Sequence, residues 1–180
     1  MKNERIRIEK EHEALKINIR AFFDPRKQQL LMLWIVLFSI CGIAIISQFF
    51  GNYERGVKLF FVVYLVFWFF FEFKVVYAFR WRKYGLEELI VEKDTFTLVK
   101  SIGKRGITTS YRLEDIKKID FYKDANGKFV KSMNTSYWNI NRYSLALYLE
   151  KETVPFAIDI ESSEAKSILH QLRTAIKELQ

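Results

Sequence analysis

One stretch of this sequence limits the possible folds more than any other: the segment from Leu30 to Phe50 contains no charged residue. At about 1.5 Å of rise per residue, a helix of this length extends roughly 30 Å, the thickness of the hydrocarbon core of a bilayer. A core helix of a soluble protein carries polar residues at regular intervals on one side, and this segment lacks that pattern. We therefore predict a transmembrane helix over residues 30–50.

A second apolar stretch follows the short loop from Gly51 to Gly56. It is uncharged from Leu59 to Phe71 and continues past Glu72 and Lys74 to residue 79, so it reaches spanning length only if those two charges lie near an interface. We predict a second transmembrane helix at about 57–79. Because the loop is short, the two helices should be antiparallel neighbours, and Glu72 should face the interface, a partner or another subunit.

Positive charge is concentrated around these stretches. Residues 1–84 contain 14 Lys/Arg against 7 Asp/Glu, whereas residues 85–180 contain 15 against 14. Lys and Arg are retained on the cytoplasmic side of membranes, so we expect a multi-pass protein of the bacterial inner membrane with both termini cytoplasmic. Anionic lipid headgroups, rather than nucleic acid, should attract the basic flanks. The expected interface anchors are Arg26, Lys27, Arg80, Trp81, Arg82 and Lys83.

A signal peptide is a competing interpretation of the first apolar stretch. It is disfavoured because 29 residues precede the stretch, which is also longer than the roughly 7–15 apolar residues of a signal peptide. The segment 1–28 should form a cytoplasmic N-terminal part. Its apolar residues up to Phe23 fit one side of an amphipathic helix on the headgroup layer, while the alternation Leu15, Ile17, Ile19 also permits a short strand.

After residues 29–84, the predicted helical hairpin, the pattern changes to short β-rich segments. We expect strands around 89–91, 95–99, 107–113, 116–121, 128–133, 144–149 and 154–160, with turns at Gly103–Gly106 and Asp124–Gly127. Apolar residues at helical spacing follow Ser162, which predicts an amphipathic C-terminal helix that covers a hydrophobic sheet. Residues 85–180 should therefore form one cytoplasmic domain.

The order of six or seven strands and one C-terminal helix resembles the pleckstrin-homology (PH) superfold. The segment Tyr111–Ile119 is similar to the stretch of bacterial PH-like domains in which a strand leads through an acidic turn into an Ile-x-x-Ile/Val strand. Paired membrane helices before such a domain are common in that group. The resemblance implies an α+β membrane protein in which a two-helix hairpin carries a PH-like β-barrel or sandwich. It implies binding rather than a reaction.

Two groups of residues are candidates for a ligand or partner surface. Lys100, Lys104 and Arg105 resemble the basic strand–loop cluster with which eukaryotic PH domains hold phosphoinositides, although a solvated hairpin has the same composition. The second group combines aromatic faces with a guanidinium that could stack on a nucleotide or a peptide, or else form an ordinary strand and loop. It consists of Tyr137, Trp138, Arg142 and Tyr143.

The sequence contains no recognisable catalytic motif, metal-ligand spacing or dinucleotide fingerprint, so we expect neither an enzyme nor a cofactor or metal. The single cysteine, Cys41, excludes a disulfide within the chain. We expect a noncatalytic, membrane-tethered interaction module that serves as scaffold, assembly factor or regulatory subunit. Its partner would be a membrane protein or a second copy. The alternative is a ligand-gated membrane effector whose β-barrel senses a nucleotide, as in antiphage defence.

Overall fold

The computed structural model describes residues 5–11, 14–123, 137–140 and 142–179. The chain divides into two compact units, a helical unit from Phe23 to Arg80 and a β-sheet unit that joins the residues up to Phe22 with those from Trp81 onwards. The predicted strand at 128–133 and the predicted turn at 124–127 lie outside the described residues.

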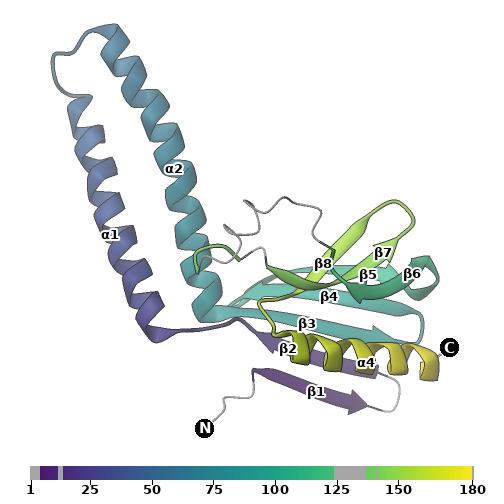
Figure 1. Ribbon diagram of the computed structural model, residues 1–180. Helices are drawn as coiled ribbons and strands as arrows, with labels where there is room; N and C mark the ends of the chain where they lie inside the picture. The colour runs from purple at the N-terminus through teal and green to yellow at the C-terminus, as the bar shows by residue number, and fades with distance from the viewer. Residues whose placement is uncertain (1–4, 12–13, 124–136, 141, 180) are drawn as a thin grey trace. The chain divides into compact units, whose positions relative to one another are not determined.

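The helical unit is an antiparallel hairpin (Figure 1). Helix α1 runs from Pro25 to Gln48, and helix α2 runs from Arg55 to Tyr84, its last turn belonging to the other unit. Asp24 caps α1, because its side chain accepts hydrogen bonds from the backbone N–H groups of Arg26 and Lys27. Both helices are long and apolar enough to cross a membrane. Each is longer than predicted, mainly at the end that carries the basic residues.

Close packing between the helices is possible because α1 has a glycine at the contact. The indole of Trp68 lies so near Gly42 that an added Cβ would come within 2.2 Å of its ring. The indole N–H of Trp68 also donates to the carbonyl of Phe38 at 2.9 Å. The small residue therefore lets the large one reach the backbone of the neighbouring helix.

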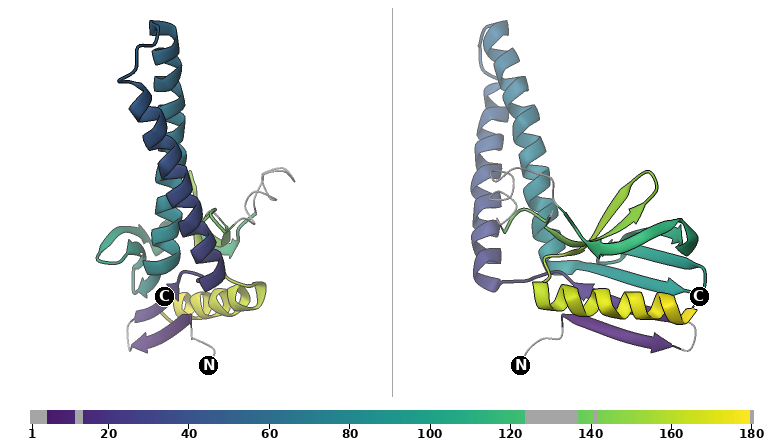
Figure 2. Two further views of the ribbon diagram at one scale, coloured as in Figure 1. Left: turned by 90° about the vertical axis from the view of Figure 1, so that its left-hand side faces the viewer. Right: turned by 45° about the vertical axis from the view of Figure 1, so that its right-hand side comes forward.

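In the part of the chain that the structure describes, the β-sheet unit contains two antiparallel sheets, a short 3-10 helix and the α-helix α4 (Figures 1 and 2). The first sheet has the strand order β1-β2-β3-β4-β5, and the second has the order β6-β7-β8. The elements are β1 (Ile6–Glu11), β2 (Ala14–Arg20), β3 (Gly85–Glu92), β4 (Thr95–Ile102), β5 (Arg105–Arg112), the 3-10 helix η1 (Leu113–Asp115), β6 (Ile116–Phe121), β7 (Tyr143–Leu149), β8 (Thr153–Ile158) and α4 (Ser162–Leu179).

The N-terminal segment differs from the expected surface helix. It forms the strands β1 and β2, which pair with each other. Strand β2 also pairs with β3, although the whole helical hairpin separates the two strands in the sequence; Leu15 lies opposite Val91 and Ile17 opposite Leu89. The alternative of a short strand is therefore the correct one. The reason is burial: Leu15, Ile17 and Ile19 alternate with polar residues and are 2% exposed or less, which only a strand packed on a core allows.

Among the residues that the structure describes, the segment from Gly85 onwards contributes six strands, in agreement with the six or seven predicted there, and the N-terminal segment adds β1 and β2 to the same unit. Within the described residues the strands form two separate sheets and do not close into a barrel. The core between them is apolar and filled by β2, β3, β4, β7, β8 and α4. Its largest fully buried side chains include Phe96 and Phe156, whose ring centroids are 5.8 Å apart. Helix α4 contacts strands of both sheets, as its amphipathic pattern predicted.

Candidate interaction surface and its supporting cluster

The turn between β4 and β5 presents two exposed cations. Gly103 and Lys104 form a two-residue turn between the paired residues Ile102 and Arg105. Gly103 has a φ of +63°, which glycine adopts at no steric cost, and a glycine at the first turn position is typical of a tight hairpin. Its N–H donates to the carbonyl of Tyr84 at 3.1 Å, which fixes the turn to the last residue of helix α2.

Strand β5, which begins at this turn, is the most exposed strand of the unit. Every residue from Arg105 to Arg112 is exposed except Tyr111, which is half-buried. Ile107 retains 76% of its accessible surface, an unusual value for an apolar strand residue. Within the described residues β5 pairs with β4 alone. It is therefore an edge strand with both faces in contact with solvent.

The third predicted cation of this hairpin, Lys100, is turned away from it. Its ammonium donates to the carbonyl of Pro155 at 3.2 Å and lies 4.6 Å from the ring centroid of Tyr143. It also approaches the carboxylate of Glu87 at 3.8 Å. Burial lowers the pKa of the Lys100 ammonium, and Glu87 opposes this shift. The structure thus separates Lys100 from Lys104 and Arg105.

Glu87 is the most deeply buried charged side chain near this lysine, with 1% exposure. Its carboxylate accepts a hydrogen bond from the N–H of Ile158 at 3.0 Å. Burial raises the pKa of Glu87, while Lys100 and the N–H groups of Ile158 and Ala157 pull that pKa down. The carboxyl group of Glu87 therefore contacts both the backbone at the end of strand β8 and the ammonium of Lys100.

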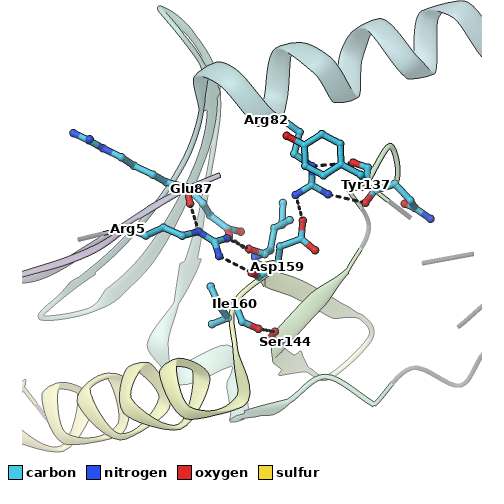
Figure 3. Close-up of polar contacts among 10 residues, drawn as sticks. Arg5, Arg82, Glu87, Tyr137, Ser144, Asp159 and Ile160 are labelled. Carbon is cyan, nitrogen blue, oxygen red and sulfur yellow. Dashed lines mark hydrogen bonds and ion pairs between the residues drawn. The ribbon is translucent and has the colours of Figure 1, made fainter. Parts of the chain in front are cut away.

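The end of β8 has an uncommon backbone conformation. Ala157 and Asp159 have φ values of 62° and 54°, in the left-handed region that residues with a side chain rarely enter. The surrounding groups fix this conformation: Arg5 donates to the carbonyls of Ile158 and Asp159 at 2.9 and 2.6 Å (Figure 3). Burial lowers the pKa of Arg5. Sequence analysis missed Arg5, Glu87 and Asp159.

Arg82 approaches the same turn from the last turn of helix α2 (Figure 3). It forms an ion pair with the carboxylate of Asp159 and donates to the carbonyls of Tyr137 and Asn139 at 3.0 and 3.2 Å. Its guanidinium lies 4.8 Å from the ring centroid of Tyr137. At 3% exposure, Arg82 is a buried structural cation, although the sequence suggested an interface anchor.

The other predicted anchors divide in the same way. Trp81 is buried at 2% exposure, whereas Arg26, Lys27, Arg80 and Lys83 are exposed. Of the aromatic group, Tyr137 and Tyr143 lie against Arg82 and Lys100, while Trp138 and Arg142 are exposed. The structure therefore brings Lys100, Arg82, Tyr137 and Tyr143 into buried or half-buried contacts and leaves Lys104 and Arg105 on the exposed hairpin, while Trp138 and Arg142 lie at other exposed positions.

The helical unit has its own buried polar contact. The hydroxyl of Ser39 donates to the carboxylate of Glu72 at 2.6 Å, and the second carboxylate oxygen is buried without a hydrogen-bond partner in the described residues. Ser39 lies near the middle of the apolar stretch 30–50. At the end of the hairpin where α1 begins, the side-chain amide of Gln28 donates to the carbonyl of Phe79. The register therefore places Glu72 deeper along the hairpin than an interface position would be.

An open groove lies at the far end of strand β5 from the turn. Its volume is about 870 Å³, and its lining contains four carboxylates and two ammonium groups. Burial raises the pKa of the Tyr111 hydroxyl on its wall, and the charge of Glu152 adds to this shift. The groove is lined by Tyr111, Glu114, Asp115, Lys117, Leu149, Glu150, Lys151 and Glu152.

The described residues contain no group of three or more His, Cys, Asp or Glu side chains that could hold a metal ion. Among known proteins, the chain matches no protein-family model and no curated protein sequence. Its function must therefore be inferred from its own geometry.

Proposed function

We propose that this protein is a membrane-tethered, noncatalytic interaction module that acts as scaffold, assembly factor or regulatory subunit at the inner face of a bacterial plasma membrane. One observation carries the proposal. The second apolar helix, which ends at Tyr84, continues without a linker into a sheet whose outermost strand, β5, is exposed on both faces. In this proposal the anchor holds a strand edge that pairs with none of the other described strands near a membrane, where partners are concentrated in two dimensions.

The helical hairpin supports the membrane part of this proposal. At about 1.5 Å per residue, the 24 residues of α1 extend about 36 Å and the 30 residues of α2 about 45 Å. In the most apolar window of each helix only 6% of the residues are buried, unlike the core helix of a soluble protein. The polar side chains of Gln28, Ser39 and Trp68 bond within the hairpin, as lipid requires.

The β-sheet unit supports a binding role. Two antiparallel sheets followed by one amphipathic helix fit a PH-like arrangement, which serves as a scaffold for recognition. The competing function, a nucleotide-sensing membrane effector, needs a polar cavity between the sheets. The core there is filled by apolar side chains such as Phe96, Leu147 and Phe156, each fully buried. This packing favours the interaction module over the sensor.

Fractionation of cells that express the full chain tests the anchor. The protein should stay in the membrane pellet after extraction at alkaline pH and enter solution only with detergent. Reporter fusions at either terminus should be active on the cytoplasmic side. Release by alkaline extraction without detergent would refute the tether.

Purification in mild detergent tests the interaction. Charge reversal of the hairpin cations, Lys104→Glu with Arg105→Glu, should reduce the co-purifying partner several-fold while the domain stays folded. A matched control reverses two exposed lysines of helix α4, Lys166→Glu with Lys177→Glu. Equal recovery of the same partner with both double variants would remove the basic hairpin from the proposal.

A further inference from the structure

The outward hydrogen-bonding groups of strand β5 can be assigned from its hairpin. In a two-residue hairpin the residues that flank the turn exchange both backbone hydrogen bonds, and hydrogen-bonded and non-hydrogen-bonded pairs then alternate along the strands. The pairs Ile102–Arg105 and Lys100–Ile107 are therefore of the bonded kind. The N–H and C=O groups of Gly106, Thr108 and Ser110 point away from β4.

A side-chain contact agrees with this assignment. The hydroxyls of Thr97 and Ser110, which are opposite each other in the register, lie 2.9 Å apart. Side chains of non-hydrogen-bonded pairs are the closer ones in an antiparallel ladder, so this contact fits a pair whose backbone groups face outward. Strand β5 therefore offers a regular row of donors and acceptors to another extended chain.

Charge differs between the two ends of this edge. Lys104 and Arg105 are exposed at the turn. At the opposite end, η1 and the turn between β7 and β8 form the groove of about 870 Å³, in which four carboxylates outnumber two ammonium groups. The exposed Arg112 also lies at this end and is paired with Glu114 at 2.6 Å, so the four carboxylates face three cations in all. A chain that lies along β5 therefore meets positive charge at one end and a weaker, net negative charge at the other.

A second copy of this chain is a poor occupant of the edge. In a symmetric antiparallel pair of two β5 strands, residues with outward backbone groups must lie opposite each other. Centred on Thr108, such a pair sets Gly106 opposite Ser110 and Lys104 of one copy opposite Arg112 of the other. Like charges directly opposite each other destabilise a strand pair. A parallel pair in register would place each arginine beside the same arginine of the other copy, which again brings like charges together. The charges instead favour a different segment with the opposite polarity.

We infer that β5 binds an extended segment of a partner protein as an additional strand, with Asp or Glu side chains beside Lys104 and Arg105 and a Lys or Arg side chain in the acidic groove. This inference rests on the proposed interaction function and specifies the chemistry of its partner. Backbone hydrogen bonds to Gly106, Thr108 and Ser110 supply the pairing, and Ile107 offers an apolar contact on one face. The two charged ends set the direction of the bound strand.

The probe for this inference is a labelled peptide of about ten residues with alternating Thr and Val, two Glu at one end and two Lys at the other. A second peptide has the reverse order of charges, and a third has Ser at both ends. Binding to the full chain in nanodiscs of phosphatidylcholine is measured by fluorescence anisotropy. One of the two charged peptides should bind at least about tenfold more tightly than the uncharged one.

Two substitutions at one position isolate the backbone contact. Thr108→Pro removes an outward N–H without removing a hydrogen bond to β4, and it should weaken binding about tenfold or more. Thr108→Val keeps the N–H and should bind like the wild type. In the wild type, hydrogen exchange of residues 105–112 should slow when peptide is present, a measurement that does not depend on how well the proline variant folds.

Equal binding of the three peptides, or unchanged hydrogen exchange in β5 at saturating peptide, would overturn the inference. The inference would also be overturned if the protein bound phosphatidylglycerol vesicles through Lys104 and Arg105 and bound none of the peptides, because those cations would then be assigned to lipid. In either case, a partner that still co-purifies with the membrane-extracted protein leaves the proposed function standing. Loss of that partner together with release from the membrane would refute the proposed function itself.

Discussion

The helical hairpin and the β-sheet unit place their polar and apolar groups in opposite ways. In the sheet unit, Phe96, Leu145 and Phe156 are fully buried, while most charged side chains lie outside. In the hairpin, large apolar side chains such as Phe60 and Phe69 are 67% and 66% exposed, and the polar contacts of Ser39 with Glu72 lie between the helices. The sheet unit thus has the distribution of a water-soluble domain, and the hairpin has the distribution that the proposed membrane anchor requires.

The comparison has one informative exception on the sheet side. Arg5, Arg82 and Glu87 bring charge into the interior of a unit that otherwise excludes it, and all three converge on the left-handed turn that contains Asp159. Buried charges are costly unless they are paired and hydrogen-bonded, and here backbone carbonyls and N–H groups complete the set. The cluster therefore fixes one specific backbone conformation where β8 ends.

The largest expected effect is found by comparing a phenylalanine buried in the sheet unit with an exposed phenylalanine of the hairpin. Phe156→Ala opens a cavity in the core and should lower the free energy of unfolding of the β-sheet unit by about 3–5 kcal/mol. The matched variant Phe69→Ala, on the exposed face of α2, should change it by less than about 0.5 kcal/mol. Urea unfolding of the detergent-solubilised protein measures both. Similar losses of unfolding free energy for the two variants would contradict the opposite placement of apolar side chains in the two units.

The second prediction compares a buried ion pair with an exposed one. Asp159→Asn keeps the shape of the side chain but leaves the guanidinium of Arg82 without its carboxylate, and should destabilise the β-sheet unit by about 3 kcal/mol. Glu114→Gln breaks the pair with Arg112, whose two side chains are both mostly exposed, and should cost less than about 1 kcal/mol. A loss at Glu114 as large as that at Asp159 would show that burial does not decide the strength of these pairs.

The residues that were predictable differ in kind from those that were not. The long apolar stretches predict α1 and α2 because their length and composition are those of helices that can cross a membrane, and Gly103 predicts its turn because few residues adopt that φ. The pairing of β2 with β3 was not predictable, since a strand of seven residues fits a helical period nearly as well and its partner lies beyond the whole hairpin.

The positions of the cations were only partly predictable. Lys100 follows Phe96 and Leu98 at every second position, so the strand period alone indicated that it faces the core. Glu87 precedes Leu89 and Val91 in the same way. For Arg82 no such signal exists, because the partner carboxylate at Asp159 is separated by 77 residues and its backbone conformation is visible only in the fold.

The third prediction uses the pH dependence of this buried charge. Burial raises the pKa of Glu87 in the folded protein above the ordinary value of 4.5, so the folded state keeps a proton that the unfolded chain has already lost. The wild type should therefore lose stability relative to Glu87→Gln as the pH rises above about 4.5. The loss should be about 1.4 kcal/mol for each step of one in pH, until the carboxyl ionises in the folded protein as well.

The measurement for Glu87 is the urea midpoint of both proteins between about pH 4 and pH 8. The exposed carboxylate of Glu92, at the end of the same strand, provides the control Glu92→Gln. Its curve should run parallel to that of the wild type. A wild-type protein that gains stability relative to Glu87→Gln over this range would reverse the sign and show that Lys100 outweighs burial.

The smallest expected effect tests the inside of the hairpin. Ser39→Ala removes the hydrogen bond to Glu72 and should weaken the association of α1 and α2 by about 0.6 kcal/mol, and by no more than about 1.7 kcal/mol. Ser47→Ala is the control, because that hydroxyl donates to the carbonyl of Ala44 within its own helix. Titration with SDS in mixed micelles measures the separation of the helices. A larger loss for Ser47→Ala than for Ser39→Ala would mean that the hydrogen bond between Ser39 and Glu72 does not hold the two helices together.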